Sequence, residues 1–350
     1  MRKPAILALS AAATMALTAL AGAAQAQAQA GAASTKASTP ASATASSSAS
    51  TVRYAWLKSC SKKDDAFPCG LWHLALGNGR DSVLKDAQVF PRTAKGKIDK
   101  GSYAPLSVSG DGRRVSYWRK KDGLLVVRDV TTNKVRVLPR AVSKLPKGIG
   151  MGDLGTSLSR DGGLLTMDYY DDEKLPSLVV NVRTGRVRTI PAEAAVVGFS
   201  PDGKHVLVSQ GTAENTTRFS VYDQDGRRTN TQIVPQVVAN NSPMALADDG
   251  SSVAVLISTT SGKQRLRVYD LSDDTVGEAV EVRVPKNESA KRLEWTPDGG
   301  LRLWETLDSA KTGETYRVVV RGLDSGTGAT TTLDSFRVKS SLWTWWLPGE

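Results

Sequence analysis

The sequence predicts an all-β fold, a six-bladed β-propeller of four-stranded blades, and three observations support this prediction. Asp-Gly pairs recur at intervals of 41 to 50 residues, a spacing typical of propeller arrays. Each interval holds short apolar runs separated by turn residues, with no helical periodicity. The two ends of the chain also complement each other as parts of one blade. The recurring pairs begin at Asp111, Asp161, Asp202, Asp249 and Asp298.

Each Asp-Gly pair predicts a tight turn between the first and second strands of a blade. Glycine accepts a positive φ and aspartate tolerates one, so the pair suits a hairpin between two apolar runs. Because the pair recurs along the chain, we expect these carboxylates to be structural rather than catalytic.

Residues 1–50 precede the predicted propeller and differ from it in composition. Arg2 and Lys3 stand before an apolar run, Ala5 to Leu20, and Ala-Gln-Ala triplets follow from Ala24. This order is typical of a secretory signal peptide, and the run is shorter than the roughly 20 residues that a membrane span needs. We therefore expect a signal peptide at 1–30 and a flexible Ala/Ser/Thr-rich tether at 31–50. The mature protein is then secreted or envelope-associated and lacks a transmembrane segment.

Residues 51–350 hold the predicted propeller, and the second blade shows its pattern most clearly. Its four expected strands are Pro105–Ser109, Arg114–Trp118, Leu124–Arg128 and Lys134–Leu138. The first blade has only three strands, at Val52–Leu57, Leu71–Leu76 and Ser82–Leu84. The C-terminal Trp346-Leu-Pro-Gly matches Trp295-Thr-Pro-Asp of the preceding copy. We therefore expect the C-terminal strand to join the N-terminal blade and close the ring, which removes the open edge.

The two cysteines, Cys60 and Cys69, flank a polar loop between two strand-like runs. In an oxidising compartment such a pair predicts a disulfide. No second pair or histidine cluster completes a metal site, so we expect neither a metal nor a cofactor.

The net charge of +11 falls to +9 when Arg2 and Lys3 are removed with the signal peptide. In an exported protein without a recognition helix, this excess favours a protein or an anionic envelope polymer as partner, and not nucleic acid. A solvated basic surface is the other interpretation.

Connecting loops on a rigid scaffold commonly carry recognition residues. We expect such residues on the face formed by the connections between second and third strands and between blades. The candidates there are Lys62, Lys63, Arg119, Lys120, Lys121, Tyr169, Tyr170, Asp171 and Asp172.

An acidic cluster, Asp168-Tyr-Tyr-Asp-Asp-Glu173, lies within this set. Its carboxylates can hold Ca²⁺, perform acid–base chemistry on a glycan, or form a solvated loop. The spacing matches no known Ca²⁺-binding loop.

Two residues, Glu294 and Trp345, interrupt a pattern of small residues on the inner strands. The matched positions elsewhere are Ser107, Ser157, Gly198 and Ala245. Either Trp345 packs between blades while Glu294 bonds a neighbouring backbone, or the two form one wall of a site in the central channel.

Two segments carry a family resemblance: Phe199-Ser-Pro-Asp-Gly-Lys-His-Val-Leu-Val and Trp295-Thr-Pro-Asp-Gly-Gly-Leu-Arg-Leu-Trp. They resemble the WD40-like propeller repeats of TolB-type proteins, and the similarity covers 51–350. The resemblance implies a propeller fold. Related propellers serve as interaction platforms, as gating domains of peptidases and as enzymes.

The sequence offers little for catalysis. It contains no Gly-x-Ser-x-Gly elbow, and its two histidines, His73 and His205, occupy repeat positions filled elsewhere by unrelated residues. We therefore expect a monomeric, non-catalytic binding module that recognises a protein or anionic envelope component through its loops. The alternative is a propeller-type hydrolase or lyase that acts on a carbohydrate or lactone.

Overall fold

The computed structural model describes residues 50–350, apart from 63–64, 171–173, 260–261 and 286. The expected signal peptide at 1–30 lies outside the described residues, as does the tether at 31–50 apart from Ser50.

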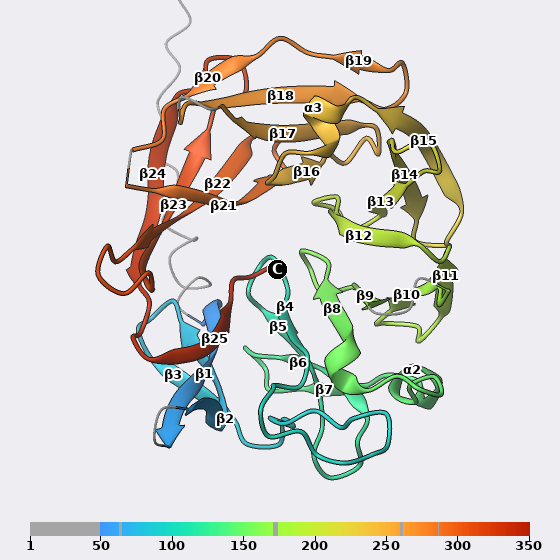
Figure 1. The fold of residues 1–350 in the computed structure, drawn as a ribbon, viewed down its shortest axis with the longest axis vertical. Coiled ribbons are helices and arrows are strands. Elements are labelled where there is room, and N and C mark those ends of the chain that lie inside the picture. The colour runs from blue at the N-terminus through green and yellow to red at the C-terminus, as the bar shows by residue number, and fades with distance from the viewer. Residues whose placement is uncertain (1–49, 63–64, 171–173, 260–261, 286) are drawn as a thin grey trace, which may run out of the picture. The chain divides into compact units, whose positions relative to one another are not determined.

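Six antiparallel sheets surround a central axis, which confirms the predicted six-bladed β-propeller (Figure 1). Blade 2 has the strands β4 (Leu106–Val108), β5 (Arg114–Trp118), β6 (Leu125–Asp129) and β7 (Val135–Val137). Blade 3 has β8 (Leu154–Leu158), β9 (Leu164–Tyr169), β10 (Ser177–Asn181) and β11 (Val187–Ile190). Blade 4 has β12 (Ala194–Phe199), β13 (His205–Gly211), β14 (Thr217–Asp223) and β15 (Arg228–Val234). In each of these blades the strands pair in chain order.

The last two complete blades follow the same plan. Blade 5 has β16 (Met244–Leu246), β17 (Ser252–Ser258), β18 (Gln264–Asp270), β19 (Thr275–Val276) and β20 (Val280–Val282). Blade 6 has β21 (Ser289–Trp295), β22 (Leu301–Asp308), β23 (Thr315–Leu323) and β24 (Thr330–Arg337).

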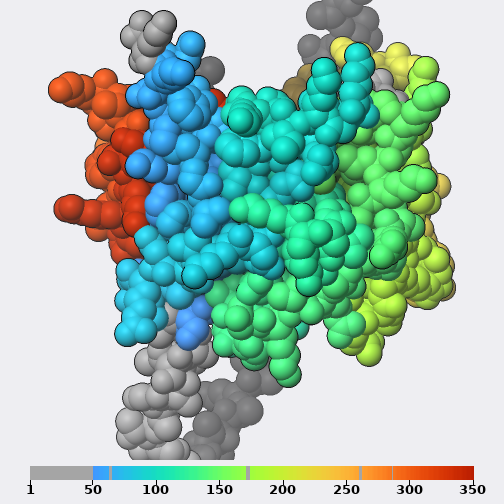
Figure 2. All heavy atoms as spheres, turned by 90° about the horizontal axis from the view of Figure 1, so that it is seen from below, coloured from blue at the N-terminus to red at the C-terminus, as the bar shows by residue number. Residues whose placement is uncertain are grey.

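Blade 1 joins the two ends of the described chain, as predicted. Its strands are β1 (Val52–Lys62), β2 (Asp65–Leu76), β3 (Asp81–Leu84) and β25 (Leu342–Trp346), in the order β25-β1-β2-β3. Trp345 lies opposite Trp56, and Trp346 lies opposite Ala55. Figure 2 shows the red C-terminal residues beside the blue N-terminal blade. The ring is closed by hydrogen bonds between its first and last strands.

The blades pack face to face through alternating apolar side chains. One cluster joins blades 1 and 2 through Trp72, Leu74, Val115 and Tyr117, all at most 1% exposed. Since successive strand residues point to opposite faces, each blade contributes one apolar set to each neighbour. The core is therefore divided into seams between blades, and side chains at the inner and outer strand ends remain available for other roles.

Two features differ from the predicted pattern. The outer strand of blade 5 is split into β19 and β20, both paired with β18, and the register shifts by one residue between the pairs Tyr269–Val276 and Leu266–Val280. Short helical turns also occur before inner strands: α2 (Arg140–Ser143), η1 (Met151–Asp153) and α3 (Gln236–Ala239). Within the described part of the chain, no helix has the length and apolar character that crossing a membrane requires.

The Asp-Gly pairs form the turns between first and second strands. Gly112 has a φ of 70°, and its N–H donates to the Ser109 carbonyl at 2.8 Å. The Asp111 carboxylate accepts from the Ser109 hydroxyl at 2.6 Å and the Arg113 N–H at 2.9 Å. Antiparallel pairing places these turns on the same face as the turns between third and fourth strands. We call this the turn face and the opposite one the loop face.

Candidate functional site

The predicted basic residues of the loop face have different surroundings. Lys62, Lys120 and Lys121 are exposed. Arg119 instead forms an ion pair with Asp122 at 2.5 Å within its own loop. The predicted candidates Lys63, Asp171 and Asp172 lie outside the described residues.

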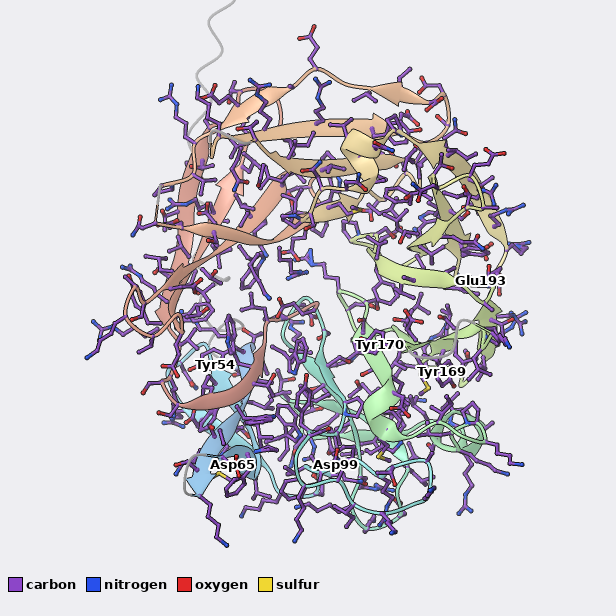
Figure 3. All side chains as sticks on the ribbon, in the orientation of Figure 1. Tyr54, Asp65, Asp99, Tyr169, Tyr170 and Glu193 are labelled. Carbon is purple, nitrogen blue, oxygen red and sulfur yellow. A yellow bond between two sulfur atoms is a disulfide. The ribbon has the colours of Figure 1, made fainter. Side chains whose placement is uncertain are left out.

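The two predicted tyrosines have opposite environments. Tyr169 is the last residue of β9 and only 8% exposed, because the strand continues the buried alternation of Leu165 and Met167. Tyr170 is 68% exposed and lies nearer the centre of the ring (Figure 3). Its ring packs over Gly155, where a Cβ would come within 1.8 Å of the tyrosine hydroxyl.

Tyr170 lines a loop-face cavity of about 290 Å³ together with Tyr103 and Trp346. The rings of Tyr103 and Trp346 are 6.1 Å apart. The aromatic residue of the C-terminal strand in this cavity is thus Trp346 and not its predicted neighbour Trp345.

Asp168 is the described carboxylate of the acidic cluster, and it links two blades. It accepts a hydrogen bond from the Ser177 hydroxyl at 2.8 Å and another from the Val196 N–H at 3.3 Å. These partners are structural. Residues 171–173, on which the Ca²⁺ and acid–base hypotheses also depend, lie outside the described residues.

Glu294 and Trp345 do not share a cavity wall. Trp345 packs edge-on against Tyr54 between blades, with ring centroids 6.3 Å apart, as the first of the two interpretations expected. Glu294 is buried, but it bonds the guanidinium groups of Arg292 and Arg302 and not a neighbouring backbone. Glu294 lines a channel cavity that Trp345 does not line, so neither interpretation describes both residues.

The two histidines pack against other residues. His73 lies parallel to Trp56, with ring centroids 4.1 Å apart, and burial lowers its pKa. His205 lies next to Gly250, where a Cβ would come within 3.1 Å of the imidazole.

The predicted disulfide is confirmed. Cys60 and Cys69 are bonded, with their Cα atoms 5.8 Å apart, across the β1–β2 hairpin. The bond fits an extracellular or envelope location.

A groove of about 910 Å³ lies on the turn face, and we call it the turn-face groove. It crosses the strand ends of blades 2, 3 and 4. Its cationic residues are Arg114, Lys134, Arg136, Arg183 and Lys204. Its carboxylates are Asp129, Asp161 and Asp202.

The three carboxylates of the groove are committed to turns. Asp129 accepts from the Thr131 hydroxyl at 2.7 Å, and Asp161 accepts from the Ser159 hydroxyl at 2.8 Å. Burial alone would raise the pKa of Asp202, but hydrogen bonds from Lys204 and Ser200 outweigh it and lower that pKa to about 2. All three groups accept hydrogen bonds that hold the backbone.

Two of the cations, Lys134 and Arg183, are exposed and contact no carboxylate in the described structure. The Arg136 guanidinium donates to the Arg183 carbonyl at 2.8 Å and so links blades 2 and 3. Arg114 donates to the Asp161 carbonyl at 2.5 Å. These hydrogen bonds to backbone carbonyls orient the guanidinium groups of Arg136 and Arg114 without neutralising their charge.

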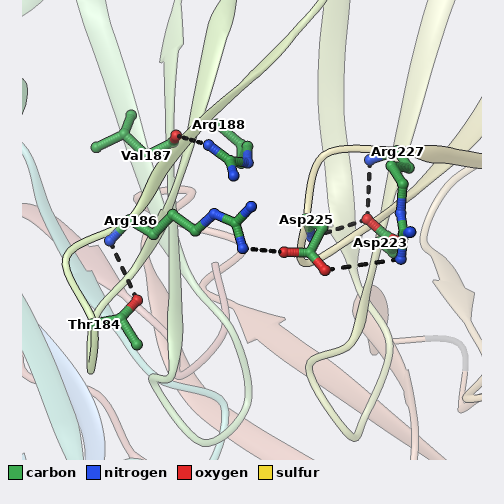
Figure 4. A network of polar contacts seen from close by, with 7 residues as sticks. All are labelled: Thr184, Arg186, Val187, Arg188, Asp223, Asp225 and Arg227. Carbon is green, nitrogen blue, oxygen red and sulfur yellow. Dashed lines mark hydrogen bonds and ion pairs between the residues drawn. The ribbon is translucent and has the colours of Figure 1, made fainter.

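A network beside the groove shows the opposite arrangement (Figure 4). Arg186 of blade 3 pairs with Asp225 of blade 4 at 2.7 Å, and Arg227 pairs with Asp223 at 2.9 Å. These arginines are neutralised by partners within the propeller. Lys134 and Arg183 of the groove differ from Arg186 and Arg227 in having no such carboxylate partner in the described structure.

Arg160 was not singled out from the sequence, although a signal was present. It occupies the variable position of Ser-x-Asp-Gly, where other copies have Gly110, Pro201, Asp248 and Pro297. It is the sole cation among these copies, and it lines the central channel.

The geometry defines a closed six-bladed β-propeller with a basic groove on its turn face. Neither a family model nor a curated protein matches this sequence.

Several solved structures are similar to this chain at low sequence identity. TolB from Acinetobacter baumannii is 11% identical over 83% of this chain and 81% of that one, with a TM-score of 0.43. The TolB described as putative from Agrobacterium tumefaciens is 16% identical over 72% of this chain and 90% of that one, with a TM-score of 0.43. An oligogalacturonate lyase in complex with manganese is 16% identical over 83% of this chain and 76% of that one, with a TM-score of 0.41.

Proposed function

We propose that this chain is an exported, non-catalytic propeller that binds an acidic segment of a protein partner in its turn-face groove. The observation that carries the proposal is the charge of the groove. Five cationic side chains line it against three carboxylates that also hold turns, a net charge of +2 (5 minus 3), and Asp202 pairs with Lys204 at 2.8 Å.

A ligand with carboxylates suits this groove because Lys134 and Arg183 lack acidic partners. Complementary charge increases the rate of encounter and selects against basic competitors. The orientation of Arg136 and Arg114 by backbone carbonyls reduces the entropy lost when they bind an anion.

The dimensions and lining of the groove favour a peptide segment. Its volume of about 910 Å³ is at the upper end for ligand pockets. Between the cations it is also lined by apolar side chains: Val135 is half-buried, and Val127, Leu164 and Val182 are buried beneath it. A segment with alternating acidic and small apolar residues can contact both kinds of surface.

Two further observations support the rest of the proposal. Both histidines pack in repeat positions and neither lines the groove. The Cys60–Cys69 disulfide suits an oxidising compartment.

Fluorescence anisotropy with labelled peptides tests the proposal. A twelve-residue peptide of alternating Asp and Val should bind more tightly than peptides with Asn or Lys in place of Asp. Reversal of two groove charges in Lys134→Glu/Arg183→Glu should weaken binding of the acidic peptide by about tenfold or more, which corresponds to about 1.4 kcal/mol.

The matched control is Lys95→Glu/Lys97→Glu, which changes net charge equally at two exposed positions outside the groove. It should leave the affinity within about twofold of the original. Equal binding of the acidic and Asn peptides would refute the proposal, as would an equal loss in the control.

A further inference from the structure

The central channel contains a second concentration of positive charge, separate from the turn-face groove. A cavity of about 100 Å³ lies among the inner strands β8, β12, β16 and β21 and the C-terminal segment. Arg160 and Arg292 line it, and Glu294 is its one lining carboxylate. Arg160 also lines the wider turn-face mouth of the channel, together with Arg302.

The three guanidinium groups have more donors than the surrounding residues satisfy. Glu294 accepts from Nη2 of Arg292 and, at 3.0 Å, from Nη1 of Arg302. Nη1 of Arg160, Nη1 of Arg292 and Nε of Arg302 are buried without a hydrogen-bond acceptor in the described structure. Glu294 thus pairs with two of the three cations, Arg292 and Arg302, and Arg160 has no ion-pair partner in the described structure. The nearby Lys291 and Glu350 neutralise each other at 3.4 Å.

Arg292 is held in place by its neighbours. Its guanidinium lies 5.5 Å from the centroid of the Trp304 ring. On another side it contacts Gly349, where a Cβ would come within 2.3 Å of Nη2. The Gly349 N–H donates to the Val108 carbonyl at 2.7 Å, which fixes the C-terminal segment against blade 2. The C-terminal segment thereby orients Arg292, whose positive charge Glu294 alone does not neutralise.

Buried guanidinium nitrogens without acceptors, one in each of these half-buried arginines, are unfavourable, and guanidinium groups match the geometry of oxyanions. The cavity is larger than the space that one water molecule needs, so it can hold a small oxyanion such as phosphate or sulfate. We propose that the channel binds a small oxyanion between Arg160 and Arg292. The ligand is a free ion or the terminal group of a larger molecule.

Isothermal titration calorimetry of the full chain with inorganic phosphate, in Tris-chloride at pH 7, tests this proposal. We expect saturable binding of one ion and a rise in melting temperature, since a ligand that binds the native state stabilises it. Arg160→Gln should weaken phosphate binding about tenfold or more. Because Arg160 forms no ion pair, this substitution leaves no carboxylate unpaired and should preserve folding.

The control is Arg113→Gln, at an exposed arginine of the same channel mouth, and it should leave phosphate binding within twofold. Binding of phenyl phosphate as tight as that of phosphate would identify a terminal group as the ligand, and weaker binding would identify the free ion. Lys134→Glu/Arg183→Glu should retain phosphate binding, so this inference and the proposed function can fail separately. Absence of saturable heat and of a melting shift with both phosphate and sulfate would overturn the inference, as would unchanged affinity in Arg160→Gln.

Discussion

The buried carboxylate Glu305 predicts a pH-dependent stability that ordinary glutamates do not have. Glu305 on β22 is 0% exposed, and it shares the Arg321 guanidinium with Glu288. Two carboxylates thus surround one cation, and Oε1 of Glu305 has no hydrogen-bond partner in the described residues. Burial, together with Glu288, raises the pKa of Glu305 from 4.5 to about 7.

A raised pKa means that the folded protein binds the proton more tightly than the unfolded chain does. The resulting stabilisation is complete below pH 4.5 and is lost as the pH rises to about 7. A shift of about 2.5 units at about 1.36 kcal/mol per unit amounts to about 3 kcal/mol.

Glu305→Gln replaces the carboxyl group with a neutral isostere and so removes this dependence. Urea unfolding, followed by the fluorescence of the eight tryptophans, measures the free energy of unfolding of both proteins between pH 4.5 and pH 8. The variant should gain about 3 kcal/mol relative to the unmodified protein across this range. A difference between the two proteins that is constant with pH would refute the raised pKa.

Two other predictions concern blade 1: one its disulfide and the other its closing strand. Cys60→Ser/Cys69→Ser should lower the free energy of unfolding by about 2.7 kcal/mol, the value that the chain-entropy model gives for a loop of about ten residues. Urea unfolding measures this loss. An unchanged unfolding midpoint would contradict the prediction. Deletion of 342–350 removes β25 and leaves β1 as an open edge, so calorimetry should show no cooperative transition; a melting curve like that of the full chain would argue against closure.

Much of the fold could be predicted because its determinants are local. The Asp-Gly turns depend on a positive φ that glycine provides, as at Gly112 and Gly203. The match between the segments at Trp346 and Trp295 predicted the closing strand before any contact was known. The split outer strand of blade 5 was not predicted, because it depends on a one-residue register shift against β18 that no residue pattern indicates.

The candidate sites were less accessible to sequence reasoning because they depend on contacts between blades. Lys134 and Arg183 are 49 residues apart in the sequence (183 minus 134) and line one groove only after blades 2 and 3 pack. Arg160 and Arg292 come from blades 3 and 6 and meet at the axis. Tyr169 was assigned to a loop, although the alternation of Leu165 and Met167 already indicated that the strand continues through it.

The central claim is that the turn-face groove binds an acidic segment. Reversing the charge of the groove and the charge of the peptide tests this claim most directly. Anisotropy titrations should compare the alternating Asp–Val and Lys–Val peptides on the unmodified chain and on Lys134→Glu/Arg183→Glu. The account predicts that the unmodified chain prefers the acidic peptide and that the variant loses this preference or reverses it. The same preference in both proteins would show that the turn-face groove is not where an acidic segment binds.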